Sequence, residues 1–215
     1  MHLSPIFYSF TRFKENIYFH GKRTQRKIAL TFDDGPSEQT EKALRILKKY
    51  NAKTTFFVLG KKIKNNNKTL RKIIQQGSEI GNHSYNHFSL TGKSIRFSKQ
   101  QIEKTDDELS KLNIQTKLFR PPYGKLNYGS LIVARNLNKK IILWDVDPKD
   151  WKLRGIKTTS DYILKKIKNG SIIDLHDSIE GFGENKDLLR ILNQIIPELQ
   201  KRGYQLVTVS ELLSY

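Results

Sequence analysis

Two adjacent carboxylates, Asp33 and Asp34, close an apolar run in the stretch LTFDDGP. Neighbouring residues that leave a strand point to different sides, so one acid could bind a metal ion while the other stands beside its water. A divalent cation, together with Arg120, would compensate the two charges, whereas buried unpaired carboxylates would have raised pKa values. The alternative, helix-cap and turn formation before Gly35 and Pro36, would account for one acid only.

Two histidines, His83 and His87, stand four residues apart in GNHSYNH, a spacing that places both imidazoles on one face of a helix. Such a pair alone is weak evidence, because a surface or core pair bonded to backbone gives the same spacing. The stretch also lacks the Glu of HExxH, so zinc-protease chemistry does not follow. A carboxylate from DDGP would complete three protein ligands and leave a fourth position for water, as in catalytic zinc sites.

A third histidine, His176, ends the stretch SIIDLH. A lone histidine after a buried strand is commonly structural, but beside a metal site it can protonate a leaving nitrogen or oxygen, and Asp150 could hold it for that task. Trp144 and Trp151 bracket the acidic loop that contains Asp150. Exposed rings there would suit sugar rings, although Trp144 could equally belong to the core.

These side chains need elements that position them, and from residue 27 onward β-prone apolar runs alternate with segments of helical period. Ser98 and Ser160 are expected as helix N-caps. The alternation predicts an α/β protein with a mostly parallel sheet, closed or nearly closed into a barrel, and helices outside it. The expected strands are residues 27–32, 54–58, 79–81, 117–120, 140–144, 171–175 and 205–209, and the expected helices are residues 38–50, 69–76, 99–112, 130–137, 161–168 and 187–202.

The candidate chemical groups follow the ends of these expected strands. Parallel sheets and barrels gather their functional loops at the carboxyl ends of the strands, so the groups should meet there. They are Asp33 and Asp34 after the first strand, His83 and His87 after the third, Arg120 at the end of the fourth, Asp145, Asp147 and Asp150 after the fifth, and His176 and Asp177 after the sixth.

The 215-residue chain has a formal charge of +18 and contains no cysteine. Disulfides, thiolate metal sites and a cysteine nucleophile are therefore excluded, and a metal must bind through His, Asp or Glu. The charge favours an anionic partner such as nucleic acid, a membrane surface or an acidic cell-wall polymer. The basic run at residues 61–72 is interpreted as a solvated face rather than a dedicated anion site.

The length fits one domain, expected at residues 27–215 as the catalytic domain, with an N-terminal arm at residues 1–26. We also expect the chain to be a monomer. The arm shows no apolar core typical of a secretory signal, and no stretch of the chain is long enough to span a membrane.

Five ordered motifs resemble those of the polysaccharide deacetylases of the NodB-homology group, carbohydrate esterase family four, over about residues 27–215. They are TFDDGP at 31–36, HSYNH at 83–87, RPPYGKLN at 120–127, DPKDW at 147–151 and HD at 176–177. The resemblance implies a distorted (β/α) barrel of about seven parallel strands. It also implies metal-dependent hydrolysis of N-acetyl groups on amino-sugar polymers, or of O-acetyl groups on other polysaccharides.

The resemblance also implies roles for individual residues. Asp34, His83 and His87 are similar to the family's metal ligands. Asp33 is similar to its general base, Arg120 to the residue that positions the base, and His176 to its general acid, tuned by Asp150. The backbone N–H of Tyr123 would help to hold the oxyanion, and Trp151 is similar to the aromatic residue that walls the acetyl pocket. Zn²⁺ is the default metal of such a site, with Co²⁺, Ni²⁺ or Mn²⁺ as alternatives.

One position departs from the family pattern. The residue two before the acid histidine is usually leucine, packed on the acetyl methyl, and here it is Asp174. Strand alternation would point Asp174 toward the site, as it does His176. Alternatively, Asp174 turns aside to a basic neighbour, and Leu175 or Ile173 packs on the methyl instead.

The leading hypothesis is a metal-dependent deacetylase of amino-sugar polymers such as peptidoglycan or chitin-like oligosaccharides, acting outside the cytoplasm, with a cytoplasmic location as the alternative. A carbohydrate-binding protein with little turnover, on the same scaffold, is a second hypothesis, because a fold does not guarantee activity. A nucleic-acid-binding protein is disfavoured, because the lysines are spread widely and no nucleic-acid motif is present. The positive surface is better interpreted as attraction to an anionic cell-wall polymer.

Overall fold

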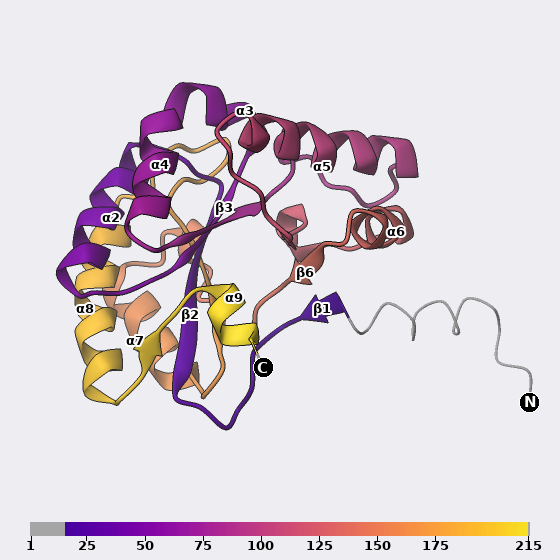
Figure 1. Cartoon of the computed structure of the whole chain (residues 1–215). Coiled ribbons are helices and arrows are strands. Elements are labelled where there is room, and N and C mark those ends of the chain that lie inside the picture. Colours follow the sequence, from indigo (N-terminus) through magenta and orange to yellow (C-terminus); the bar gives the residue numbers. More distant parts are fainter. Residues whose placement is uncertain (1–15, 215) are drawn as a thin grey trace, which may run out of the picture.

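The computed structural model describes residues 16–214, which build one sheet surrounded by helices (Figure 1). Seven strands follow one another in the order β1-β6-β5-β4-β3-β2-β7, and β8 pairs with β2 beside this path. Every strand pair in this sheet is parallel, which confirms the predicted α/β barrel architecture. The strands are β1 (Ile17–Tyr18), β2 (Lys27–Asp33), β3 (Thr55–Val58), β4 (Glu79–Asn82), β5 (Leu118–Phe119), β6 (Lys140–Ile142), β7 (Ile172–His176) and β8 (Gln205–Leu206).

The helices lie outside the sheet, and α2, α4, α7 and α8 form one flank in Figure 1, with α5 and α6 away from them. Ser37 caps α2, and its hydroxyl accepts a hydrogen bond from the backbone N–H of Gln39. The helices are α2 (Glu38–Lys49), α3 (Gly60–Ile63), α4 (Asn67–Gln75), α5 (Ile95–Ser110), α6 (Tyr128–Asn136), α7 (Ile156–Lys166), α8 (Leu188–Lys201) and α9 (Val209–Leu213), with 3-10 turns η2 (Lys64–Asn66), η3 (Pro122–Gly124) and η4 (Asp150–Lys152).

The two ends of the sheet approach each other without forming a full ladder. Isolated bridges join Val146 to Ile173 and His20 to Ser171, so the chain near β1 and β6 reaches β7. The short helix α9 contributes Val209 and two leucines to a buried cluster that also contains strand residues. The barrel is therefore distorted, as predicted, and apolar side chains fill its interior away from the carboxyl ends of the strands.

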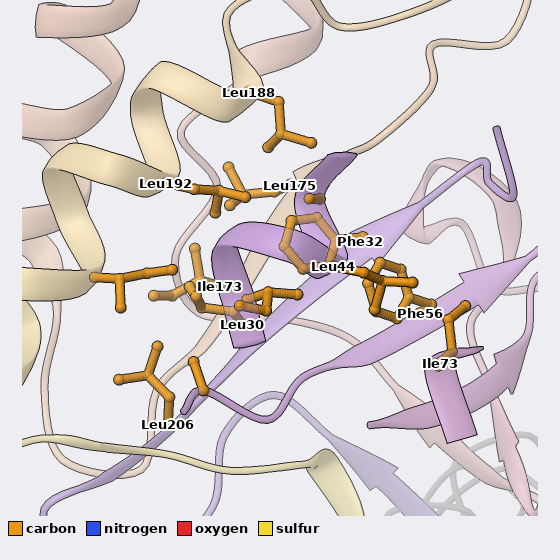
Figure 2. Close-up of a cluster of buried hydrophobic side chains, with 14 of the residues drawn as sticks. Leu30, Phe32, Leu44, Phe56, Ile73, Ile173, Leu175, Leu188, Leu192 and Leu206 are labelled. Carbon is orange, nitrogen blue, oxygen red and sulfur yellow. The ribbon is translucent and has the colours of Figure 1, made fainter. Parts of the chain in front are cut away.

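The largest buried cluster lies between the strands β2, β3 and β7 and the helices outside them (Figure 2). Alternate residues of β2, namely Ile28, Leu30 and Phe32, belong to this cluster. Phe32 stacks on Phe56 of β3 with ring centroids 4.8 Å apart. Because side chains alternate along a strand, the residues between them must face the inside of the barrel.

Several local predictions were wrong. Residues 17–18 form a strand within the expected arm, and the expected last strand ends at Leu206, because Thr208 caps α9. Ser98 and Ser160 are buried inside α5 and α7 rather than at their N-caps, and Ser94 caps α5 instead. Residues 1–15 of the expected arm lie outside the described residues, and the domain division otherwise stays a prediction.

Within residues 16–214, none of the helices combines the length and the apolar character that crossing a bilayer requires.

The core predicts a large cost for truncation of Phe56, which is buried against Phe32. Phe56→Ala should lower the free energy of unfolding by about 3–5 kcal/mol, because it removes buried apolar surface and leaves a cavity. Urea denaturation followed by circular dichroism measures this. Ile74→Ala on α4, where the side chain is 46 % exposed, is the control and should change stability by within about 0.5 kcal/mol. Equal effects of the two variants would contradict this description of the core.

Candidate active site and metal centre

Strand alternation aims the candidate residues at one another. On β2, Thr31 and Asp33 face inward, opposite in direction to Phe32 of the core cluster. In the parallel register with β7, Asp33 lies beside His176 and Thr31 beside Asp174. The residues that bear charge are therefore neighbours across two strands, at the carboxyl end of the sheet.

Asp34, His83 and His87 form a candidate metal centre. The atoms that they offer lie within 4.8 Å of one another, and the Asp34 Oδ1 atom is 3.6 Å from His83 Nε2 and 3.2 Å from His87 Nε2. The predicted helical face for the two histidines is wrong, because His83 follows β4 and a turn with left-handed backbone at Ser84 and His87 brings the rings together. Their centroids are 5.1 Å apart.

The state of these side chains fits a divalent metal. His83 Nδ1 lies 2.9 Å from the carbonyl oxygen of Arg120, so that nitrogen donates its hydrogen and Nε2 keeps a lone pair. Burial and the neighbouring His83 lower the pKa of His87 to about 4, so its ring is neutral at neutral pH. Asp34 Oδ1 is buried and accepts no hydrogen bond in the described structure. A cation would satisfy this oxygen and both nitrogens.

Contacts from helix α3 and from the loop after β7 hold Asp34 in its left-handed conformation, at a φ of 71°. The backbone N–H of Glu180 donates to Asp34 Oδ2 at 3.1 Å, and Lys62 Nζ donates to the Asp34 carbonyl oxygen at 2.8 Å. Glu180 belongs to a tight loop, residues 179–183, which Ile179 and Gly183 close through backbone hydrogen bonds. We call this segment the 179–183 hairpin.

A buried acid, Asp177, packs against the DDGP turn. Asp177 accepts a hydrogen bond from the Thr40 hydroxyl, and a Cβ atom at Gly35 would collide with its carboxylate. Burial raises the pKa of Asp177 to about 7. Gly35 is therefore required by close packing, not only by the turn.

Arg120 is the central cation of the site and is fully buried. Its guanidinium carbon lies 4.1 Å from the centroid of the Phe57 ring and 5.3 Å from that of the Trp144 ring. Its Nη1 atom donates to three oxygens, which are Asp33 Oδ1 at 2.7 Å, Thr31 Oγ1 at 2.8 Å and Asp174 Oδ1 at 2.9 Å. Asp174 therefore binds a basic neighbour, as the second alternative expected, but it also lines the cavity with His176, as strand alternation predicted.

The two acids on Arg120 differ in charge state. Burial alone would raise the pKa of Asp33, but Arg120 and the two nearest histidines outweigh it and hold the pKa below its ordinary value. Burial and the charge of Asp33 raise the pKa of Asp174 well above its ordinary value. Because one guanidinium offsets only one negative charge, the site favours the ionised form of Asp33 over that of Asp174.

His176 is bound to Asp150 on the other side of the cavity. Its Nδ1 atom lies 2.9 Å from Asp150 Oδ1, and its backbone N–H donates to Asp150 Oδ2 at 2.9 Å. Asn185 Nδ2 also donates to Asp150 Oδ2, at 2.8 Å. Burial opposes a charged ring, but Asp150 outweighs burial and raises the pKa of His176 well above its ordinary value. The imidazole can therefore hold a proton for transfer at neutral pH.

These groups line a cavity of about 380 Å³ at the carboxyl end of the sheet. Its rim is aromatic, with Tyr123 58 %, Trp151 44 % and Phe182 87 % exposed. Tyr123 packs on His87 with ring centroids 4.6 Å apart. The remaining lining residues are Asp33, Asp34, His83, His87, Trp144, Asp147, Asp174, His176, Ile179 and Glu180.

Two expectations differ from this arrangement. Leu175 and Ile173 cannot pack on an acetyl methyl, because both face the helices and belong to the core cluster (Figure 2). Asp145 pairs with Arg23 at 2.7 Å and also accepts from Ser171 and from the backbone N–H of Ile172, so it fastens β7 and does not line the cavity.

Other functional neighbours were missed in the sequence. The alternation of β2 could have identified Thr31, which lies two residues before Asp33. No local pattern identified Asn185, Lys62, Ile179 or Phe182, because each reaches the site from a loop or helix that only the fold brings close.

The comparisons with known proteins agree with this fold. A family model described as polysaccharide deacetylase matches residues 20–142. Over 194 residues the chain is 35 % identical to the peptidoglycan-N-acetylglucosamine deacetylase of Bacillus cereus, covering 89 % of this chain and 90 % of that protein. The crystal structure of the Bc1960 peptidoglycan N-acetylglucosamine deacetylase, in complex with 4-naphthalen-1-yl-N-oxidanyl-benzamide, superposes with a TM-score of 0.89 at 34 % identity, covering 95 % of this chain and 96 % of the other.

A further relative is larger. Over 190 residues the chain is 40 % identical to PdaC, the peptidoglycan-N-acetylmuramic acid deacetylase of Bacillus subtilis. The matched region is 87 % of this chain but only 39 % of that protein. A half-closed parallel barrel with a candidate metal centre at the carboxyl ends of its strands is the arrangement expected of a polysaccharide deacetylase. The chain belongs to the polysaccharide deacetylase family.

The position of Arg120 predicts that its loss is costly. Arg120→Met should lower the free energy of unfolding of the metal-free protein by about 3–5 kcal/mol, because Asp33 and Asp174 would lose their shared cation. Urea denaturation with a chelator present measures this. Adding Asp174→Leu should recover part of the loss, since one buried acid is then removed. A single variant as stable as the wild type would contradict the role given to Arg120.

Proposed function

We propose that this chain is a metal-dependent hydrolase that removes N-acetyl groups from the amino sugars of peptidoglycan. The observation that carries the proposal is the placement of Asp33 and His176 side by side on β2 and β7, next to the Asp34, His83 and His87 cluster, in one cavity. The names of the two relatives support peptidoglycan as the polymer. Such a substrate would place the activity in the cell envelope, and the +18 charge would favour association with an anionic wall.

The metal ligands in this proposal are Asp34, His83 and His87, and Zn²⁺ is the metal that such a donor set takes by default. Co²⁺, Ni²⁺ and Mn²⁺ are compatible with the same ligands. The bound metal would polarise the acetyl carbonyl and lower the pKa of the attacking water.

The protein side chains then move the protons. Asp33, kept ionised by Arg120, accepts a proton from the attacking water. His176, kept protonated by Asp150, donates a proton to the departing amine nitrogen. The C–N bond of the amide breaks, and acetate and the free amino sugar leave. Tyr123, whose backbone is held at a φ of 61°, and Trp151 would line the path of the acyl group.

The proposal is tested by acetate release from N-acetylglucosamine oligomers. Metal-stripped protein should be inactive and should regain activity with zinc. Asp33→Asn should keep bound zinc but lose about 10²–10⁴-fold in kcat, because the water then lacks its base. His83→Ala should lose both zinc and activity. Zinc content is measured by elemental analysis of the same samples.

Full activity of Asp33→Asn would contradict its role as base. Absence of acetate release with any of the four metals, while oligomers still bind, would instead support a carbohydrate-binding protein without turnover.

The pair His176 and Asp150 predicts a change in pH dependence. The alkaline limb of kcat/KM should fall where His176 loses its proton, and Asp150→Asn should move that limb to lower pH. The reason is that Asp150 stabilises the charged imidazole, so its removal lowers the pKa of His176. Asp145→Asn, an acid of the same loop that pairs with Arg23 instead, should leave the limb in place. A limb unmoved by Asp150→Asn would exclude His176 as the titrating acid.

A further inference from the structure

One buried polar group in the cavity has no part in the proposed mechanism. Of the described lining residues with ionisable side chains inside the cavity, Asp33, His176 and the three candidate ligands have roles in the proposed mechanism, whereas Asp174, 3 % exposed, has none. Asp174 faces inward from β7, two residues before His176. The structure shows one side-chain bond for it, from Arg120 Nη1 to Oδ1 at 2.9 Å.

Asp174 lies close to the two residues that are proposed to move protons. Asp33, Asp174 and His176 each offer an oxygen or nitrogen atom, and these three atoms lie within 4.8 Å of one another. The carbonyl carbon of the substrate must lie between the base Asp33 and the acid His176. A substituent on that carbon would then come within reach of the carboxyl group of Asp174.

The exposure of the lining residues also favours an acyl group bound next to Asp174. Tyr123, Trp151 and Phe182 form an exposed rim, where a sugar ring can stack and the polymer can leave. Asp174 lies at the buried floor, where the small acyl group is the part of the substrate that fits. Two further acids line the cavity, and each already has a partner. Glu180 pairs with Lys61, and Asp147 accepts a hydrogen bond from the backbone N–H of Lys149.

A carboxyl group at the floor is matched poorly by a methyl group. An acetyl methyl excludes water from Asp174 and returns no hydrogen bond, which is unfavourable for a buried polar group. A hydroxymethyl group fills the same place and supplies a hydroxyl, which donates to a carboxylate and can also accept from a protonated carboxyl. The match therefore holds whether or not Asp174 is protonated.

We propose that Asp174 is a specificity residue that makes hydroxyacetyl (glycolyl) amides of amino sugars substrates of this enzyme, in preference to acetyl amides. The inference rests on the proposed function, since it concerns the acyl group at the same site. The amide C–N bond breaks and water adds to the carbonyl carbon. Asp33 takes the proton from water, His176 gives one to the amine, and the products are glycolate and the free amino sugar.

The test compares two N-acylated glucosamine oligomers of equal length, one acetylated and one glycolylated, with the zinc-loaded enzyme. Glycolate and acetate are quantified by ion chromatography, and kcat/KM is obtained for each substrate. The wild type should favour the glycolyl oligomer. Asp174→Leu should reduce the ratio of glycolyl to acetyl kcat/KM by about tenfold or more, because the hydroxyl then meets an apolar floor.

A second variant keeps the test decisive if the leucine variant folds poorly. Asp174→Asn keeps a group that can donate to and accept from a hydroxyl, so it should retain the glycolyl preference although its bond to Arg120 changes. Melting temperature and zinc content, measured on each variant, separate a change in specificity from a loss of folding or metal.

The outcomes for the two proposals differ. A wild type that releases acetate efficiently and glycolate poorly would overturn the role of Asp174 and leave the deacetylase function standing. A ratio unchanged in Asp174→Leu would do the same. Release of neither acid from zinc-loaded protein would overturn the proposed function and, with it, this inference.

Discussion

The buried guanidinium of Arg120 is the interaction on which the site depends. It shares one nitrogen among Asp33, Asp174 and Thr31, and its backbone carbonyl accepts the hydrogen of His83 Nδ1. The same residue thus favours the ionised form of Asp33, the proposed base, and fixes which nitrogen of a candidate metal ligand is free. A buried arginine without such partners would be strongly unfavourable, so the acids and the cation stabilise each other and neither can be lost alone without cost.

Parallel strand pairing explains why these partners meet. Each strand alternates between the helical layer and the barrel interior, and the register between β2 and β7 places Asp33 opposite His176. Phe57 and Gly81 are paired in the same way on β3 and β4, and a side chain at Gly81 would collide with the Phe57 ring on which Arg120 rests. The placement of Arg120 therefore depends on the close packing of these apolar residues as well as on its charged partners.

Much of this arrangement could be predicted from the sequence, because strand alternation and the rule that sites lie at carboxyl ends depend on local pattern alone. The grouping of Asp33, His83 and His176 at one edge is an example. The helical interpretation of the spacing between His83 and His87 failed, because left-handed backbone at Ser84 and His87 leaves no periodic signal. Asn185 escaped prediction for a different reason, since its contact with Asp150 joins residues 35 positions apart.

The 179–183 hairpin contacts both the candidate metal centre and the outer part of the cavity. Its Glu180 N–H holds Asp34, whereas its Ile179 and Phe182 line the cavity that would receive the proposed substrate. A molecule that orders this hairpin therefore also orders a ligand of the proposed metal. By thermodynamic linkage, the two binding equilibria cannot be independent, and whatever factor the metal adds to the affinity for polymer, the polymer must return to the affinity for metal. A polymer that binds better to the metal-loaded protein would therefore also help the protein to keep its ion.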